Sequence, residues 1–313
     1  MADIQDDTYR RILEGAKTKG RIRVGVVHPV KISAIQAAYE AFELGLIEPV
    51  LIGPRDRILA AAAENNSDIS GWQLIDAEHS HAAAETAVAM AAKGEIEALM
   101  KGALHTDELL RPIVAKGSGL RTERRVSHAF ILNGPFYHKP LIITDAAVNI
   151  APDLEQKADI CRNAIQLWRV LFGMDQKPKV AILSAVETVT PTMPSTLDAA
   201  ALCKMADRGQ ITDAYLDGPL AFDNIISPEA AREKGIESPV AGDADIIVVP
   251  DIEAGNALAK QLIFLSHAQA AGIVLGARVP VILTSRADTL QTRILSCVTA
   301  LYLAHARKAG QIK

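Results

Sequence analysis

The chain has 313 residues, of which 49% are hydrophobic and 22% charged, and its formal net charge is −4 at pH 7. This length and apolar content allow a large core, divided into one large or two moderate domains. The net charge gives no general attraction to nucleic acid, the acidic start lacks a signal-peptide core, and no apolar run approaches the roughly 20 residues of a membrane-spanning helix. We therefore expect a cytoplasmic protein that binds neither nucleic acid nor membrane.

The cysteines and histidines do not suggest a metal site or a disulfide framework. Cys161, Cys203 and Cys297 are widely spaced among helix-forming residues, which favours buried apolar packing. The histidines show no metal-site spacing and have no acidic cluster beside them. We expect no bound metal.

The first 150 residues alternate between short apolar runs and alanine-rich helical patterns. Strands are predicted near 21–27, 49–53, 72–76 and 97–102, and helices near 33–44, 56–63, 81–92 and from 106 onward. Because parallel strands need long, usually helical crossovers, this order predicts a mostly parallel sheet with helices on both faces. The fold class is therefore α/β.

Arg111 lies in the helix that begins near Thr106, close to the carboxyl edge of the preceding strand. In open α/β sheets that edge lines the ligand crevice. The planar guanidinium suits phosphate better than an ammonium does, so Arg111 is a candidate for binding a substrate anion. An arginine on a helix surface is otherwise usually just solvated.

Residues 120–133 place three arginines before a further strand: Arg121, Arg124 and Arg125. A solvated basic loop would explain them equally well. The next strand, 139–144, ends at Asp145, and Asn149 precedes a break at Ala151-Pro152 that predicts a domain boundary.

The strand and helix alternation starts again after this break, as expected of a second α/β lobe. A helix is predicted over 153–171, followed by strands over 177–184, 215–219 and 245–250. The hydroxyl-rich segment 188–197 runs into a helix, where Ser195 and Thr196 have the position of anion ligands or of simple helix caps. After the last of these strands, Glu253-Ala-Gly-Asn256 opens a helix, and Gly255 would allow a close approach to the backbone.

Near the end of the chain, a strand over 279–283 turns into a helix that begins near Leu290. The junction, Thr284-Ser-Arg-Ala-Asp288, gathers hydroxyls, the guanidinium of Arg286 and unpaired helix amides, which is what an anion such as phosphate needs. Capping of the helix by Asp288 or Ser285 is the alternative.

Four segments together resemble the phosphate acetyltransferase/phosphate butyryltransferase family: Thr144-Asp-Ala-Ala-Val-Asn149, Asp217-Gly-Pro-Leu-Ala-Phe-Asp223, Val249-Pro-Asp-Ile-Glu-Ala-Gly-Asn256 and Thr284-Ser-Arg-Ala-Asp288. Residues 180–198 look closer to the butyryl branch. The chain also resembles the phosphate acyltransferase portion of enoyl-CoA hydratase/phosphate acetyltransferase fusions, without the hydratase portion.

The resemblance implies transfer of a short acyl group between coenzyme A and phosphate, with no tightly bound cofactor. It places the catalytic centre at Ser285 and Arg286, with Asp288 as the nearest carboxylate able to act as a base. The residues expected to bind substrate are Arg111, Arg125, Asp145, Asn149, Gly255 and Asn256.

The implied architecture is that of the isocitrate/isopropylmalate dehydrogenases, with two doubly wound α/β lobes, a site in the cleft between them, and a homodimer. We expect residues 1–148 and 286–313 to form the first lobe and residues 149–285 the second.

One departure from the family pattern concerns the general base. The acetyl branch has an acidic residue where this chain has Thr292, and the butyryl branch has Glu where this chain has Gln291. Two alternatives therefore stay open: a nicotinamide- and metal-dependent dehydrogenase of the same architecture, although neither Gly-x-Gly-x-x-Gly nor Gly-x-x-x-x-Gly-Lys-Ser/Thr is present, and a non-catalytic acyl-CoA-binding protein.

Overall fold

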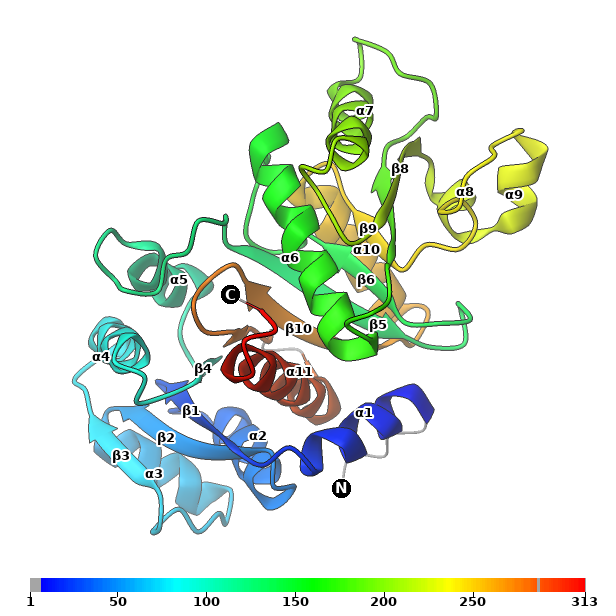
Figure 1. Ribbon diagram of the computed structural model, residues 1–313. Coiled ribbons are helices and arrows are strands. Elements are labelled where there is room, and N and C mark those ends of the chain that lie inside the picture. The colour runs from blue at the N-terminus through cyan, green and yellow to red at the C-terminus, as the bar shows by residue number, and fades with distance from the viewer. Residues whose placement is uncertain (1–6, 286–287, 313) are drawn as a thin grey trace. The chain divides into compact units, whose positions relative to one another are not determined.

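The structure is a computed structural model that describes residues 7–285 and 288–312. Its internal packing divides the chain into two compact units (Figure 1). Unit 1 combines the chain up to Arg124 with the chain from Ala271 onward, and unit 2 is Arg125–Ala270. The sequence analysis expected the lobes to divide after residues 148 and 285. The compact units divide after residues 124 and 270 instead, and the expected lobe boundaries stay a prediction.

Unit 1 is a mostly parallel sheet with the strand order β3-β2-β1-β4-β11-β10. Its strands are β1 (Ile22–Val27), β2 (Ile47–Gly53), β3 (Gln73–Asp76), β4 (Ala98–Lys101), β10 (Gln269–Leu275, which spans the unit boundary) and β11 (Val281–Ile282). All neighbours pair parallel except β10 and β11, which form an antiparallel pair with Ile273 opposite Ile282. Its helices are α1 (Asp7–Lys17), α2 (Ile32–Glu43), α3 (Arg55–Glu64), α4 (Ser80–Ala92), α5 (Thr106–Val114) and α11 (Leu290–Lys308).

The core of unit 1 depends on small side chains and on one buried helix. Alanines occupy the buried faces of α2 and α4, so these helices can lie close to the sheet. Most residues of α11 are buried, as expected of a helix surrounded by other elements. It packs against α2 and against α1, and Tyr302 donates a hydrogen bond to the carbonyl of Ile12.

Unit 2 has the strand order β5-β6-β9-β7-β8, and all neighbours pair parallel except β5 and β6. Its strands are β5 (Ser127–Asn133), β6 (Leu141–Thr144), β7 (Lys179–Leu183), β8 (Tyr215–Leu220) and β9 (Ile246–Val248). Its helices are α6 (Leu154–Phe172), α7 (Pro194–Asp207), α8 (Phe222–Ile226), α9 (Pro228–Glu233) and α10 (Ile252–Phe264). The carboxyl ends of β6, β9, β7 and β8 therefore lie at one edge of this sheet.

The α/β class and the mostly parallel pairing are confirmed. The sequence analysis missed α1, α8, α9 and β10. In the described part of the chain, no group of three or more His, Cys, Asp or Glu residues is arranged to hold a metal ion. None of the described helices has the length and apolar character needed to cross a membrane.

Candidate active site

Polar segments follow the carboxyl ends of three adjacent parallel strands in unit 1. His28 follows β1, Gly102 follows β4, and Thr284 lies just beyond β11. β2 and β3 extend the sheet on one side of β1, whereas β4 lies on its other side, so the direction of strand addition reverses between β1 and β4. Loops that leave such a reversal point diverge, and open α/β sheets bind ligands in the resulting crevice. The strand order of unit 1 therefore predicts a ligand site at the carboxyl ends of β1 and β4, independently of any sequence motif.

A crevice is present at this point, and we call it the Ser285 crevice. The polar side chains among its described lining residues are those of Lys31, Ser33, Lys101, Thr284, Ser285 and Arg293. Lys31 and Ser33 are exposed, which opens the crevice to solvent beside the amino end of α2. Of these residues, only Ser285 belongs to the predicted site.

His28 connects the two loops that border the crevice. Its Nδ1 lies 3.1 Å from the carbonyl oxygen of Ala103. Because a carbonyl can only accept, Nδ1 carries the proton and the neutral ring leaves Nε2 as an acceptor. Burial lowers the pKa of His28, which favours this neutral form.

Two hydrogen bonds join Ser285 and Asp288 between β11 and α11. The amide of Ser285 donates to Oδ2 of Asp288 at 2.6 Å, and the amide of Asp288 donates to the carbonyl of Ser285 at 3.3 Å. The N-cap is Thr289, whose hydroxyl accepts from the amide of Thr292. The alternative that Asp288 or Ser285 caps the helix is therefore wrong, because Thr289 fills that position. Arg286 lies outside the described residues.

Arg293 is the functional candidate that the sequence analysis missed. Its Nη1 donates to the carbonyl of Ser33 at 2.8 Å and its Nη2 to that of Ser285 at 3.3 Å, so it ties the start of α2 to the end of β11. Its side chain is only 7% exposed, and it forms no ion pair with a described residue. Burial lowers its pKa, and the charge of Asp288 opposes that shift. The only signal in the sequence is a charged residue inside the apolar pattern of the last helix.

The two positions where the family has an acidic base hold neutral side chains. Nε2 of Gln291 is buried and has no hydrogen-bond partner among the described residues, whereas Oγ1 of Thr292 lies 3.1 Å from Oγ1 of Thr289. Asp288 remains the nearest described carboxylate to Ser285 along this segment.

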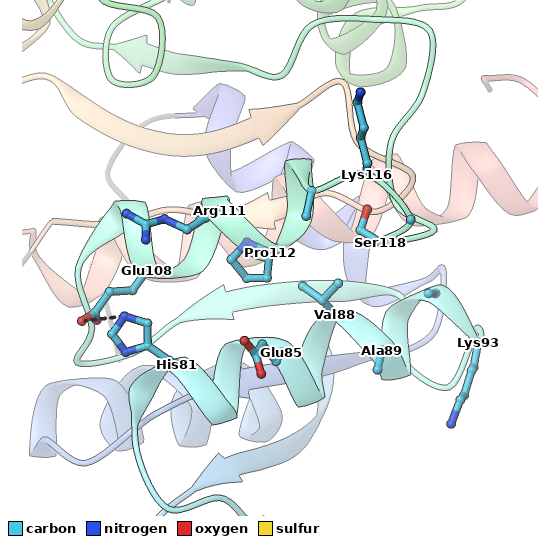
Figure 2. A pocket seen from close by; sticks show the side chains of 13 residues that line it. His81, Glu85, Val88, Ala89, Lys93, Glu108, Arg111, Pro112, Lys116 and Ser118 are labelled. Atoms are coloured by element: carbon cyan, nitrogen blue, oxygen red, sulfur yellow. Dashed lines mark ion pairs between the residues drawn. The ribbon is translucent and has the colours of Figure 1, made fainter.

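Arg111 lies at the rim of a different pocket of unit 1, between α4 and α5 (Figure 2). This pocket has a volume of about 670 Å³, and Figure 2 shows Arg111 on α5 near Glu108, which faces His81 across the gap. The N-cap residue is His105, whose amide donates to Glu108, and the helix begins at Thr106 as expected. Arg111 is exposed and makes no hydrogen bond or ion pair with a described residue, and it does not line the Ser285 crevice.

In unit 2, Asp145 and Asn149 form the centre of a buried hydrogen-bond network. Asp145 is 2% exposed and accepts hydrogen bonds from the amides of Ala147, Val148 and Asn149 and from Nδ2 of Asn149. Asn149 also donates to the carbonyl of Val126 at 2.9 Å. The carboxylate therefore fixes the turn that follows β6.

Arg125 connects to this network through one edge of its guanidinium. Its Nε donates to Oδ1 of Asn149 at 2.8 Å, and its amide donates to Asp159. Nη1 and Nη2 make no hydrogen bond to a described residue, and the side chain is exposed. Of the three arginines, Arg125 is the one that belongs to unit 2, and it donates to Asn149 there.

Gly255 and Asn256 join the same network from α10. A β-carbon at Gly255 would lie 2.6 Å from the carbonyl oxygen of Asp145, so the helix can approach the turn only with glycine here. Asn256 donates to the carbonyl of Ala146 at 3.0 Å. We call Arg125, Asp145, Asn149, Gly255 and Asn256 the Asp145 network.

The hydroxyls of the segment before α7 have partners within unit 2. Oγ of Ser195 lies 2.8 Å from Oγ of Ser184, and Oγ1 of Thr196 bonds with backbone groups of Thr190 and Met193. Met193 occupies the N-cap position without a side-chain cap, and Pro194 is the first helical residue. The hydroxyl of Thr196 therefore holds the loop before α7 in place.

Comparison with known proteins identifies a family. The family model described as "Phosphate acetyl/butaryl transferase" matches residues 81–301. A phosphate acetyltransferase of Rhizobium meliloti is 55% identical over 98% of this chain and 97% of its own length. A phosphate butyryltransferase of Clostridium acetobutylicum is 36% identical over 95% of this chain and 98% of its own length. Residues 180–198 resemble the butyryl branch, but over the whole chain the identity to this acetyltransferase is higher than the identity to this butyryltransferase.

Solved structures agree with this family. A branched-chain phosphotransacylase from Enterococcus faecalis V583 superposes with a TM-score of 0.79 at 30% identity, covering 91% of this chain and 99% of the other. A 4-hydroxythreonine-4-phosphate dehydrogenase from Klebsiella pneumoniae has a TM-score of 0.54 at 14% identity, covering 91% and 98%. The second likeness concerns the fold alone and confirms the dehydrogenase-like architecture.

Proposed function

This chain belongs to the phosphate acetyl/butyryltransferase family, and on that premise we propose that it transfers an acetyl or butyryl group reversibly between coenzyme A and inorganic phosphate. The observation that carries the proposal is the family match over most of the chain, together with a basic, hydroxyl-bearing crevice at Ser285. The reaction needs cations to hold phosphate, a donor for the developing oxyanion and a group that manages the thiol proton.

In the proposed mechanism, an oxygen of phosphate attacks the thioester carbonyl. The bond from carbon to sulfur then breaks, and the thiolate leaves and takes up a proton. Arg286, Arg111 and Arg125 neutralise substrate anions, and the hydroxyl of Ser285 donates to the oxyanion. In the reverse direction, the thiol of coenzyme A attacks acyl phosphate, and Asp288 accepts the thiol proton.

The residues of the Asp145 network have supporting roles in this proposal. Asp145, Asn149, Gly255 and Asn256 fix the turn after β6, and Asn149 on that turn accepts from Nε of Arg125, whose Nη atoms then face an anionic part of the substrate. We further propose that the enzyme binds no tight cofactor, that it is a cytoplasmic homodimer, and that its lobes divide after residues 148 and 285. Sedimentation equilibrium tests the dimer, and limited proteolysis tests the lobe boundaries.

The decisive experiment follows free thiol when purified protein is mixed with acetyl-CoA or butyryl-CoA and phosphate. Ser285→Ala should lower turnover roughly 100- to 1,000-fold, because losing one oxyanion donor costs about 2.7–4 kcal/mol in the transition state. Ser70→Ala, in an exposed turn before β3, should leave turnover unchanged. Absence of thiol release from the parent protein with every acyl length tried would contradict the proposal.

A second candidate function rests on the neutral side chains of Gln291 and Thr292. A protein that binds acyl-CoA without turning it over would show saturable acyl-CoA binding and no thiol release. The dehydrogenase alternative is not favoured, since the dehydrogenase likeness is at 14% identity and concerns the fold alone.

A further inference from the structure

His28 lies just beyond the carboxyl end of β1 and bonds to the chain on both sides of that strand. Its amide donates to the carbonyl of Ile52 in β2 at 2.7 Å. On the other side, its carbonyl accepts from the amide of Ala103 at 2.9 Å, and Nδ1 of its ring donates back to the carbonyl of Ala103 at 3.1 Å. His28 and Ala103 therefore form a reciprocal pair that joins the loop after β1 to the loop after β4.

The backbone around this pair is closely packed. A β-carbon at Gly102 would lie 2.3 Å from the carbonyl oxygen of Val27 and 2.7 Å from that of His28, so the end of β4 can lie against β1 only with glycine here. His28 has a φ of 54°, in the left-handed region where His, Asn and Asp are enriched among residues other than glycine. The position of residues 101–103 thus depends on both the backbone and the ring of His28.

The ring of His28 acts as a hydrogen-bond donor rather than as a charge. The residue is 7% exposed, and burial lowers its pKa. The bond to Ala103 and the charge of Glu108 oppose this shift in pKa, whereas the charges of Arg57 and His79 add to it. The ring is therefore uncharged at neutral pH, and its contribution to the loop is the hydrogen bond from Nδ1.

The two loops that this pair joins form walls of the Ser285 crevice. Lys31 comes from the loop after β1, and residues 101–103 come from the end of β4. His28 is not among the described lining residues, so it can act on the crevice only through the loops that it joins.

Building on the proposed function, we propose that His28 is a positioning residue, whose hydrogen bond from Nδ1 to Ala103 holds residues 101–103 beside Ser285 for acyl transfer. His28 touches no reacting atom in this role. A misplacement of about 1 Å in a site can cost roughly 100-fold in rate, so loss of the bond should lower kcat.

The test compares two substitutions that both accept the left-handed backbone. His28→Gly removes the donor, whereas His28→Asn keeps an N–H group near the place of Nδ1. We expect His28→Gly to lower kcat about 10- to 100-fold, with the KM for acyl-CoA changed by less than about 3-fold. His28→Asn should keep kcat within about 3-fold of the parent. Urea denaturation gives the folded fraction, because a purely structural role would lower stability and leave the kcat of the folded enzyme unchanged.

His267→Gly is the matched control. His267 has the same φ of 54°, but it is exposed and belongs to unit 2, so this substitution should leave kcat unchanged. Should His28→Gly not fold, His28→Asp takes its place, since aspartate matches asparagine in size and its carboxylate cannot donate. An unchanged kcat in the variant without a donor would overturn the inference. An equal loss of kcat in His28→Asn would also overturn it.

Hydrogen exchange separates this inference from the proposed function, because it needs no turnover. The amide of Ala103 donates to the carbonyl of His28, and it should exchange about 10-fold faster in His28→Gly than in the parent or in His28→Asn. If the parent releases no thiol but the exchange rates differ in this way, the acyltransferase proposal fails and the placement of the crevice wall by His28 stands. Equal exchange at Ala103 in all three proteins would overturn the inference, whatever the activity.

Discussion

The Asp145 network in unit 2 and the Ser285 crevice in unit 1 both follow the carboxyl ends of parallel strands, but their polar groups have different partners. Asp145 and Asn149 are buried, and their side chains bond to backbone groups and to each other. Lys31 and Ser33 are exposed, and the guanidinium of Arg293 donates to the backbone carbonyls of Ser33 and Ser285. The family motifs thus include residues that hold a turn in place as well as residues that are able to bind a ligand. Substitutions can distinguish structural residues from ligand-binding ones by their effects on stability and on activity.

The largest loss of stability is expected from Asp145→Ala. The substitution removes the acceptor of three backbone amides and of Nδ2 of Asn149, leaving buried donors without partners. We expect the free energy of unfolding to fall by about 3–5 kcal/mol, as measured by urea denaturation. Asp68, an exposed carboxylate that accepts the amide of Ser70, provides the control. If Asp68→Ala were as destabilising as Asp145→Ala, burial of the network would not be the source of its stability.

A smaller loss is expected from Gly255→Ala, which tests the approach of α10 to the turn after β6. The added methyl group would lie 2.6 Å from the carbonyl oxygen of Asp145 and 2.8 Å from Cγ2 of Val249, so backbone must shift. We expect a loss of about 1–3 kcal/mol in the free energy of unfolding.

Gly71→Ala is the matched control for this substitution. A β-carbon at Gly71 meets no atom within 4 Å, and its backbone is not in the left-handed region. The control should be neutral or slightly stabilising, because alanine restricts the unfolded chain. Equal destabilisation at both glycines would contradict the close packing of α10 on Asp145.

Local patterns in the sequence identified most elements but not those that depend on distant packing. The helices over 81–92 and 153–171 were predicted within one residue of α4 and α6. α1 was missed because its buried residues, Tyr9, Leu13 and Ala16, gain their partners from the last helix of the chain. β10 was missed because it pairs antiparallel to β11, whereas the prediction relied on the alternation of strands and helices that is typical of a parallel sheet.

The candidate site shows the same limit. The segment between β11 and α11 was singled out from its residue types alone, since a hydroxyl- and charge-rich junction between a strand and a helix is a local signal. Lys31 and Lys101 were not, because they meet Ser285 only through the strand order that sets β4 between β1 and β11. No spacing along the sequence encodes that order. The partners of Arg125 within the Asp145 network likewise depend on tertiary contacts.

The smallest effect on stability is expected from Asp288→Asn, at the edge of the crevice. Asparagine keeps an oxygen that can accept the amide of Ser285, and the helix cap belongs to Thr289. We expect the free energy of unfolding to change by less than about 1 kcal/mol. Thr289→Ala, which removes the cap, should cost about 1 kcal/mol and serves as the control for helix stability.

Asp288→Asn and its control, Thr289→Ala, should differ in the pH dependence of their activity. If Asp288 accepts the thiol proton, the variant must use thiol that is already ionised, which is about 1% of a thiol of pKa ~8.5 at pH 6.5 and about half at pH 8.5. Its loss of activity in the thiol-consuming direction, relative to the parent, should therefore shrink by up to ~50-fold between these pH values. Thr289→Ala should show the same relative activity at both. An equally constant ratio for Asp288→Asn would make Asp288 a structural residue of the turn, and the positive charges of the crevice would then have to lower the thiol pKa without help from a base.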